Sequence, residues 1–486
     1  MKKYYITSAI PYVNAKPHIG HALEFVQSDV IARFHKIMGD DVLLLCGSDE
    51  NAIKNVQAAE TVKIPIQEFV DMNAKLFEKL AQKLSVSFDI FQKGSSQMHH
   101  LSSQELWTKC YNSGDIYKKQ YQGLYCMGCE LFYEPDELNE QGECYEHPGK
   151  KLEKVTEENY FFRLSKYQQQ IESLLDSNTL HITPQSRKNE ILSFVKQGLK
   201  DISISRSNTR AKNWGVTVPN DESQKMYVWF DALNIYQSGI GFGSDEKTYL
   251  KWWPADLHVI GKGIIRFHAV YWPAFLLSAG IPLPKAIFSD GYLTVNGQKM
   301  SKTIGNVIDP NTLIDAYGTD AIRYYLLREI PSTADGDFSE HRLKEIYTAD
   351  LANGLGNLVS RIAKLCETSN YIQQGSEKRI SGHLINVETY TEAMYSYRFN
   401  DALSVIWKKI TILDKYINQE KPWALLKDKN EKNTAKIHGI LSHAVDELQE
   451  IAALLEPFLP ETAKEIEDQF KDPSINAKRP LFPRIV

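Results

Sequence analysis

Length, composition and charge restrict the kind of protein that this chain can be. At 486 residues the chain is too long for one ordinary core, and two to four domains are expected. Hydrophobic residues make up 43% and charged residues 24%, and no apolar run approaches a membrane span, which excludes an integral membrane protein. The net charge of −5 excludes attraction of nucleic acid over the whole surface, although a local basic face can still bind it.

The N-terminal segment "MKKYYITSAI" passes from two lysines directly into an alternating stretch of β-branched and aromatic residues. It lacks the apolar region and cleavage site of a signal peptide and the Arg/Ser-rich composition of a transit peptide. Residues 3–10 are therefore predicted to form the first strand. The protein is predicted to be cytoplasmic, with no membrane partner.

The first part of the chain has the pattern of a doubly wound α/β fold. A loop, "PYVNAKP", follows the first strand, and "DDVLLLCG" is short and continuous enough for a buried parallel strand. Between them, apolar residues recur at helical spacing up to Gly39, at Leu23, Val26, Val30, Phe34 and Ile37. Strand, helix and strand in this order begin a Rossmann-like parallel sheet.

The pattern changes twice further along the chain. From about Gly114 to Asn220 the alternation is lost, and it resumes with the short apolar runs "KMYVWFDAL", "DLHVIGKG" and "KAIFSDGYLTV". Beyond about Asp350 the apolar spacing is almost entirely helical, which predicts a separate helical bundle. The predicted parts are a Rossmann-like domain in two halves (1–114 and 226–295), a connective insertion (115–225), a linker region (296–350) and an α-helical domain (351–486).

Cysteine spacing predicts a metal site in the insertion. The segment "YCMGCELFYEPDELNEQGECYEHPG" has the pattern C-x2-C-x14-C-x2-H. Two tight ligand pairs on a short ribbon suit tetrahedral zinc, and four protein ligands leave no open position, so the zinc is expected to be structural. The predicted ligands are Cys126, Cys129, Cys144 and His147.

The segment "KPHIGHAL" places His18 and His21 in the first turn of a predicted helix. A helix N-terminus favours anions, and Gly20 lets a phosphate or a flat ring approach the backbone. A metal site is less favoured, because zinc pairs on helices usually use i, i+4 spacing with a nearby acid. Two ordinary histidines at a helix start remain the alternative.

A second segment, "NGQKMSKTIGN", has Lys299 and Lys302 in a loop bounded by glycines. Two lysines on such a loop can close over a triphosphate and neutralise the charge that develops during transfer. Taken alone, the segment is more typical of a solvated turn.

Together, H-I-G-H early and K-M-S-K-T late resemble the signature pair of class I aminoacyl-tRNA synthetases, with Thr303 where serine is more usual. Longer blocks in the same order narrow the resemblance to the methionyl-tRNA synthetase family over essentially the whole chain. These blocks are "AIPYVNAKPHIGH", "YVWFDAL", "VIGKGIIRFHAVYWPAFL", "KMSKTIGNVIDP" and "DAIRYYLLREIP".

The resemblance implies a ligase that activates L-methionine with ATP and Mg²⁺ and transfers it to the 3′ end of tRNA(Met), elongator and initiator. Positioning and charge stabilisation, rather than a covalent nucleophile, are expected to drive this reaction. The implied catalytic residues are His18, His21, Lys299 and Lys302. The implied ATP-binding residues are these four together with Gly20, Glu24, Gly261 and Ser301.

The resemblance also implies a methionine pocket with an aromatic lining, which suits a flexible and polarisable thioether. Asp49 is expected to hold the α-ammonium, and Tyr12 and His268 are expected to offer polar contacts to the sulfur. For any one of these aromatics, ordinary core packing is the alternative. The pocket residues are Ile10, Tyr12, Asp49, Trp229, Ala232, Tyr236, Phe267, His268 and Trp272.

Two positions depart from the family pattern. Where relatives read D-E-H-G, this chain has Asn51 and Ala52, and where they read G-K-D it has Gly263. The first change removes an imidazole, and the second removes a carboxylate that could hold a ribose hydroxyl or an amine. No role is therefore assigned to Asn51 or Gly263. The affinity for ATP is expected to differ from that of relatives with the usual residues.

In the helical part, "GNLVSRIAKL" places Asn357 and Arg361 four residues apart on one helix face, and "NQEKPWALL" places Trp423 at a helix start. Asn and Arg side chains can read base edges, and a tryptophan can stack on an unpaired base. By resemblance these residues read the C-A-U anticodon.

Two other classes of function remain open from the residues. A small-molecule nucleotidylyltransferase can share the H-I-G-H signature, but it would not need Asn357, Arg361 and Trp423. A non-catalytic RNA-binding relative would be expected to have lost the motif histidines and lysines, which are all present. The chain ends soon after the bundle, and the protein is predicted to be a monomer.

Overall fold

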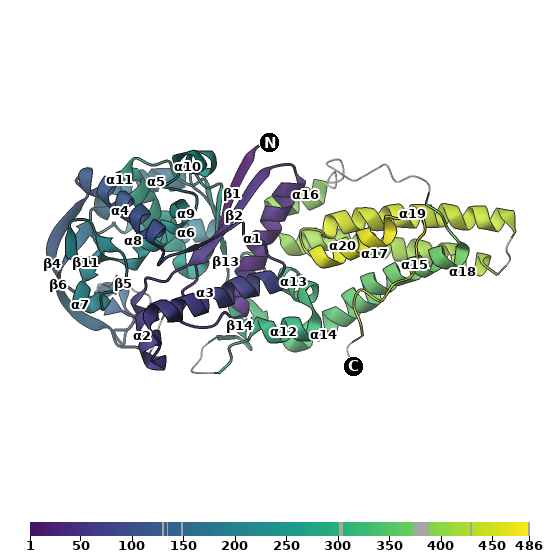
Figure 1. The fold of residues 1–486 in the computed structure, drawn as a ribbon, viewed down its shortest axis with the longest axis horizontal. Coiled ribbons are helices and arrows are strands. Elements are labelled where there is room, and N and C mark those ends of the chain that lie inside the picture. Colours follow the sequence, from purple (N-terminus) through teal and green to yellow (C-terminus); the bar gives the residue numbers. More distant parts are fainter. Residues whose placement is uncertain are drawn as a thin grey trace.

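The computed structural model describes residues 1–128, 131–133, 135–146, 149–300, 305–373, 388–427 and 430–484. An α/β lobe occupies one end of the molecule, and a long helical part extends from it, on the right of Figure 1. Within the described ranges, no helix is both long enough and apolar enough to cross a membrane.

A parallel sheet forms the centre of the α/β lobe, as the sequence predicts. Among the described residues, its strands are ordered β3-β2-β1-β12-β13-β7, and all of the pairs are parallel. The strands are β1 (Lys3–Ser8), β2 (Asp41–Ser48), β3 (Ile90–Lys93), β7 (His181–Thr183), β12 (Leu257–Gly261) and β13 (Ala286–Asp290). The carboxyl ends of β1 and β12 lie side by side at the centre, where ligands bind in folds of this kind.

Alternating residues of the inner strands enter two different cores, one on each face of the sheet. In β1, Tyr4 and Ile6 belong to one buried cluster and Tyr5 to the other, and Leu44 and Leu45 of β2 divide in the same way. This period of two is expected of a sheet buried on both faces. The first face is covered by α1 (Ile19–Ile37), α3 (Ile66–Lys83) and α13 (Thr319–Arg328), and the second by α4 (Gln97–Asn112), α9 (Ile235–Ser238) and α11 (Trp272–Ala279). Helix α2 (Ile53–Val62) precedes α3.

The insertion forms its own antiparallel sheet, in the order β5-β4-β6-β8, next to a smaller sheet in the order β10-β11-β9. Its strands are β4 (Ile116–Cys126), β5 (Leu131–Tyr133), β6 (Glu153–Phe162), β8 (Ile202–Ser203), β9 (Ser205–Ser207), β10 (Thr217–Val218) and β11 (Asp221–Met226). Its helices are η1 (Pro135–Glu137), η2 (Leu164–Tyr167), α5 (Gln168–Asp176), α6 (Gln185–Lys196) and α7 (Asn208–Ala211). Strand β7, although it lies inside the predicted range 115–225, pairs with β13 at the edge of the main sheet.

The run "KMYVWFDAL" is not a new strand. After β11 it turns into helix α8 (Val228–Ala232), which is followed by α9 and α10 (Glu246–Trp252). Its apolar side chains are all buried, and periodicity cannot distinguish a short buried helix from a short buried strand.

The segment "NGQKMSKTIGN" (residues 296–306), which we call the lysine segment, begins in a small separate sheet. This sheet is formed by β14 (Leu293–Val295), β15 (Gln298–Lys299) and β16 (Gly336–Phe338). Helix α12 (Pro310–Tyr317) leads from this sheet to α13. The N–H of Ile19 donates to the carbonyl of Ile308 at 3.1 Å, which fastens the beginning of α1 to the chain that follows the lysine segment.

The C-terminal part is helical, as predicted. After α14 (Glu340–Ile346) and a π-helical turn, η5 (Tyr347–Gly356), it comprises α15 (Asn357–Ser369), α16 (Glu388–Tyr395), α17 (Phe399–Glu420), α18 (Pro422–Leu425), α19 (Glu431–Leu455) and α20 (Pro460–Phe470). The buried guanidinium of Arg323 in α13 joins it to the α/β lobe. Arg323 donates to the carbonyl of Phe458 at 2.7 Å, next to α19, and pairs with Asp29 of α1 at 2.8 Å. The helix that begins with the predicted histidine pair is thus anchored to the helical part.

Candidate active site

The first turn of α1 is built by its two histidines. His18 is the N-cap residue, and its Nδ1 accepts a hydrogen bond from the N–H of Gly20 at 3.1 Å. His21 reaches back, and its Nδ1 accepts from the N–H of His18 at 3.1 Å. A neutral imidazole that accepts at Nδ1 carries its proton at Nε2, so each ring is a hydrogen-bond donor at Nε2.

The two imidazole rings stand 3.8 Å apart, and the ring of Phe77 meets His21 edge-on at 5.0 Å. Burial and the neighbouring His18 hold the pKa of His21 well below its usual value, so this ring is neutral at pH 7. At the positive end of the α1 dipole, neutral N–H donors of this kind suit phosphate oxygens.

The lysine segment approaches this turn from the other side of the site. A Cβ added at Gly20 would lie 3.6 Å from Cε of Met300 and 3.0 Å from the ring of His18. The structure therefore brings together two motifs that are far apart in the sequence. Lys299 is described only by its backbone in β15, and Ser301 and Lys302 lie outside the described residues.

One helical turn after His21, the carboxyl of Glu24 lies at the end of strand β12. A Cβ at Gly261 would lie only 2.7 Å from Glu24 Oε1, so a residue with a side chain there would displace the carboxyl. Burial raises the pKa of Glu24 to about 7. The predicted ATP residues Gly20, Glu24 and Gly261 thus lie around the same end of the sheet.

Aromatic residues of the predicted methionine pocket lie on α8 and on a π-helical turn, η4 (Phe267–Tyr271), and contact one another. The indole of Trp229 stacks on Phe267, with ring centroids 3.7 Å apart and planes at 7°. The ring of Tyr12, in the loop after β1, stands edge-on to Trp229 at 6.1 Å and 87°. A π-helical turn often marks a functional site, because it redirects side chains within a helix.

Tyr236 and His268 form one buried polar unit. The hydroxyl of Tyr236 lies 2.8 Å from Nε2 of His268, whose Nδ1 lies 2.9 Å from the carbonyl of Ile264. Since only an N–H can pair with that carbonyl, Nδ1 holds the proton and Nε2 accepts from Tyr236. Burial lowers the pKa of His268 to about 4, so the ring is neutral. Both of its nitrogens are engaged within the protein, and the direct contact to sulfur that the resemblance implies remains a prediction.

The other predicted pocket residues lie on the same elements. Ile10 follows β1, Ala232 is buried at the end of α8, and Trp272 begins α11. The ring of Trp272 meets Trp253 at 6.1 Å, within the core. Asp49 follows β2, and its N–H donates to the carbonyl of Pro11 at 2.9 Å, which places the buried carboxyl beside the loop of Tyr12.

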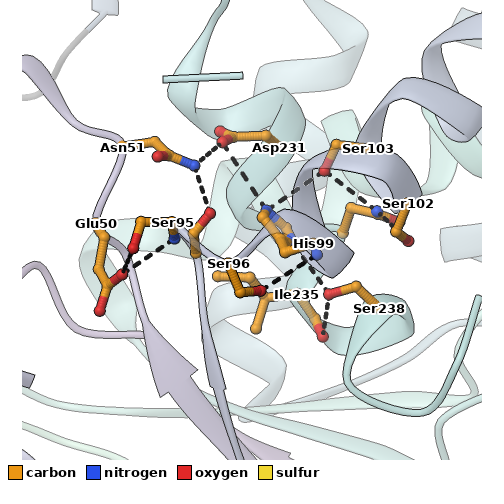
Figure 2. A network of polar contacts seen from close by, with 12 residues as sticks. Glu50, Asn51, Ser95, Ser96, His99, Ser102, Ser103, Asp231, Ile235 and Ser238 are labelled. Carbon is orange, nitrogen blue, oxygen red and sulfur yellow. Dashed lines mark hydrogen bonds and ion pairs between the residues drawn. The ribbon is translucent and has the colours of Figure 1, made fainter. Parts of the chain in front are cut away.

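Asn51, for which the sequence assigns no role, takes part in the buried network of Figure 2. Its amide donates to Asp231 of α8 at 2.6 Å and to the carbonyl of Gly94 at 2.8 Å. His99 of α4 lies 3.9 Å from the same carboxyl, and its Nδ1 lies 2.8 Å from the hydroxyl of Ser238 in α9. The network therefore ties α8, which carries Trp229 and Ala232, to α4 and α9.

Two of the four predicted zinc ligands meet in the insertion. Sγ of Cys126 and Sγ of Cys144 are 3.2 Å apart, and both side chains are buried. This distance is far too long for a disulfide, and it is close to the roughly 3.8 Å between two thiolates on tetrahedral zinc. Cys129 and His147 lie outside the described residues.

Arg361 and Trp423 come together on the helical part. The Arg361 guanidinium lies 5.6 Å from the centre of the Trp423 ring, and the indole is 41% exposed. Arg361 also donates to Asp414 at 2.7 Å and to Asn418 at 2.8 Å, both on α17. Asn357, one turn earlier on α15, is exposed. The predicted anticodon residues thus form an exposed surface in which the arginine is held in place.

Comparisons with known proteins agree with this geometry. Residues 4–363 match the family model described as tRNA synthetases class I (M), and residues 386–485 match that of the anticodon-binding domain of tRNA ligase. The methionine–tRNA ligase of Thermotoga maritima is 42% identical over 474 residues, covering 96% of this chain and 74% of its own length. The chain belongs to the methionyl-tRNA synthetase family.

Other members of this family match the chain from end to end. The methionine–tRNA ligase of Brucella suis is 40% identical over 514 residues, which cover 100% of this chain and 98% of its own. The solved methionyl-tRNA synthetase of Mycobacterium tuberculosis in complex with methionyl-adenylate has a TM-score of 0.92 at 37% identity, with 100% of each chain covered.

Beside the residues that methionyl-tRNA synthetases share by motif, the structure adds Asp290, which the sequence reasoning missed. Asp290 ends β13 and is buried, and its Oδ1 has no hydrogen-bond partner among the described residues. The signal was present, since "KAIFSD" is an apolar run that ends on a carboxylate where a parallel strand meets the ligand edge.

Proposed function

We propose that the protein joins methionine to tRNA(Met) at the expense of ATP. In the first step a carboxylate oxygen of methionine bonds to the α-phosphorus of ATP, and pyrophosphate leaves with its bonding electrons. In the second step a ribose hydroxyl of the terminal adenosine of tRNA attacks the carbonyl of the adenylate, and AMP leaves. The observation that carries this proposal is the meeting of the His18–His21 turn and the lysine segment beside an aromatic pocket.

In this proposal the first turn of α1 and the lysine segment hold the phosphates. The Nε2–H groups of His18 and His21 donate to phosphate oxygens, and Lys299 and Lys302 neutralise the charge that develops as pyrophosphate leaves. Mg²⁺ accompanies ATP. The stacked rings of Trp229 and Phe267 lie against the thioether, and Asp49 pairs with the α-ammonium, which holds the carboxylate in place for attack.

We assign two further sites to the same function. Zinc, held by Cys126, Cys129, Cys144 and His147, would have a structural role in the insertion, a role that the 3.2 Å approach of Cys126 and Cys144 supports. The exposed surface of Asn357, Arg361 and Trp423 would read the C-A-U anticodon, with the indole stacking on one base.

We further propose that the protein acts in the cytoplasm as a monomer and charges both elongator and initiator tRNA(Met). A sedimentation mass near twice 55.5 kDa would contradict the monomer.

Methionine-dependent exchange of pyrophosphate into ATP tests the first step, and charging of tRNA(Met) tests the second. Exchange with methionine together with charging is the expected result. Exchange with a different amino acid would overturn the specificity, and exchange without charging would favour a small-molecule nucleotidylyltransferase.

A further inference from the structure

Two carboxyl groups, the half-buried Glu24 and the buried Asp290, face each other across Gly261, and only Glu24 is expected from the family motifs. A Cβ at Gly261 would lie 2.7 Å from Glu24 Oε1 and 3.5 Å from Asp290 Oδ1. Glu24 comes from α1, whereas Asp290 ends β13 and is the register partner of Gly261. Asp290 is 2% exposed, and its Oδ1 has no hydrogen-bond partner in the described part of the chain. A buried carboxyl oxygen without a partner is costly unless a ligand completes it.

The chemistry of the pair restricts the ligand that would complete it. Burial and the neighbouring carboxyl hold the pKa of Asp290 well above its usual range, and that of Glu24 is raised as well, so the two are not both charged at pH 7. The described residues contain no group of three or more His, Cys, Asp or Glu that could hold a metal ion. A partly charged pair of acceptors suits neutral hydroxyl donors better than a divalent cation, and it repels phosphate.

The position of the pair points to the sugar of the nucleotide. On α1, Glu24 lies one turn beyond His21, so a nucleotide with its phosphates at the histidines would extend toward this carboxyl. In dinucleotide-binding folds, an acidic residue at the carboxyl edge of a parallel sheet takes the ribose hydroxyls.

Position 263 supplies no carboxyl to this part of the site. A Cβ at Gly263 would overlap the hydroxyl of Tyr292, so that hydroxyl occupies the space of a side chain here. That part of the site therefore offers no carboxylate of its own, and Asp290 is the carboxyl nearest to Gly261 from the neighbouring strand.

We propose that Asp290 is a nucleotide-specificity residue that accepts a hydrogen bond from a ribose hydroxyl of ATP, beside Glu24, in place of the carboxylate missing at position 263. This inference rests on the proposed function.

The test compares ATP with 2′-deoxy-ATP and 3′-deoxy-ATP in methionine-dependent pyrophosphate exchange. The wild type is expected to prefer ATP by about tenfold or more in kcat/KM, because the deoxynucleotide leaves a buried acceptor unpaired. In Asp290→Ala the preference over one of the two deoxynucleotides should fall to near one, while kcat/KM for that deoxynucleotide stays within about twofold of wild type.

Asp290→Leu keeps the shape of the side chain without a hydrogen-bond acceptor and serves if the alanine variant does not fold, and its preference should fall in the same direction. Asp256→Asn is the matched control, since Asp256 is a buried carboxyl at the opposite edge of the sheet, where it accepts from the N–H of Tyr5 at 2.8 Å. Its preference should equal that of the wild type.

Equal losses with all three nucleotides, or a preference unchanged by both Asp290 variants, would overturn the role of Asp290. An inactive wild type would instead contradict the proposed function itself.

Discussion

The two ends of the candidate active site differ in the kind of side chain that forms them. At the methionine end, Trp229 stacks on Phe267, and Tyr236 and His268 satisfy each other, so the pocket is shaped before a ligand arrives. At the nucleotide end, the pKa of His21 is lowered, and a buried carboxyl oxygen of Asp290 has no hydrogen-bond partner in the described chain. We propose that the shape of the aromatic pocket selects the amino acid, and that polar groups without a protein partner hold and activate ATP. The predictions below test whether these two tasks are separable.

The largest effect is expected from His21→Ala. Loss of one donor to the developing charge should lower kcat for pyrophosphate exchange about 100- to 1,000-fold. Bound zinc should be unchanged, because the variant leaves the insertion intact. The thermal midpoint should fall only by a few degrees, because the variant removes one capping hydrogen bond and one edge contact to Phe77 at the start of α1. The exposed His341→Ala is the control and should exchange like wild type. A loss of exchange no larger than the control's would remove His21 from the phosphate site.

A smaller effect is expected at the other end from Tyr236→Phe. The variant leaves Nε2 of His268 buried without its donor, which should raise the KM for methionine about tenfold. The KM for ATP should stay the same. Tyr249→Phe, which removes a hydroxyl bonded to Gln237 at 2.6 Å, is the matched control. An equal rise in both KM values would mean that the two ends are not separable.

The raised pKa of Glu24 should make the free energy of unfolding depend on pH. Folded Glu24 keeps its proton up to about pH 7, whereas the unfolded chain loses it near its ordinary pKa of 4.5, so the folded state binds more protons between these values. The free energy of unfolding attributable to Glu24 therefore falls as pH rises from about 4.5 to 7, by roughly 1–3 kcal/mol.

Glu24→Gln should remove this fall, so its thermal midpoint should exceed that of wild type at pH 8 and nearly match it at pH 5. In the described part of the chain, Asp290, Cys46 and Tyr236 are among the titratable groups whose charges interact with Glu24. If the thermal midpoints of Glu24→Gln and wild type differ by the same amount at pH 5 and pH 8, the pKa of Glu24 is not raised in the folded protein.

The smallest effect on chemistry is expected far from both ends, from Trp423→Ala. Loss of one stacked base should raise the KM for tRNA(Met) about five- to tenfold, with pyrophosphate exchange unchanged. Tyr111→Ala, which removes an exposed ring from the α/β lobe, is the control. An unchanged KM for tRNA would remove Trp423 from the anticodon site.

How much of this arrangement the sequence could predict differs between the two ends. The parallel sheet and the helical bundle follow from periodicity, and the meeting of His18 with the lysine segment follows from two short motifs, each made of residues that are neighbours in the chain. The run "KMYVWFDAL" could not be resolved, because a fully buried segment has no polar face to mark its period.

Asp290 and the Asn51–Asp231 contact were missed for a different reason. Each depends on a partner from another element. Asp290 faces Glu24 of α1 across Gly261, and Asn51 donates to Asp231 of α8. Local patterns report which face of an element is buried, but not which buried polar group meets which. Asn51, a departure from the family pattern to which the sequence assigned no role, makes one of these contacts.

The most direct test of separable ends measures methionine binding by calorimetry and pyrophosphate exchange in His21→Ala and Tyr236→Phe. We predict that His21→Ala binds methionine with the wild-type Kd but loses at least 100-fold in kcat for exchange. We predict that Tyr236→Phe weakens methionine binding about tenfold and keeps kcat within about threefold. A His21→Ala variant that loses methionine affinity as strongly as it loses exchange would contradict the division of the site into two ends.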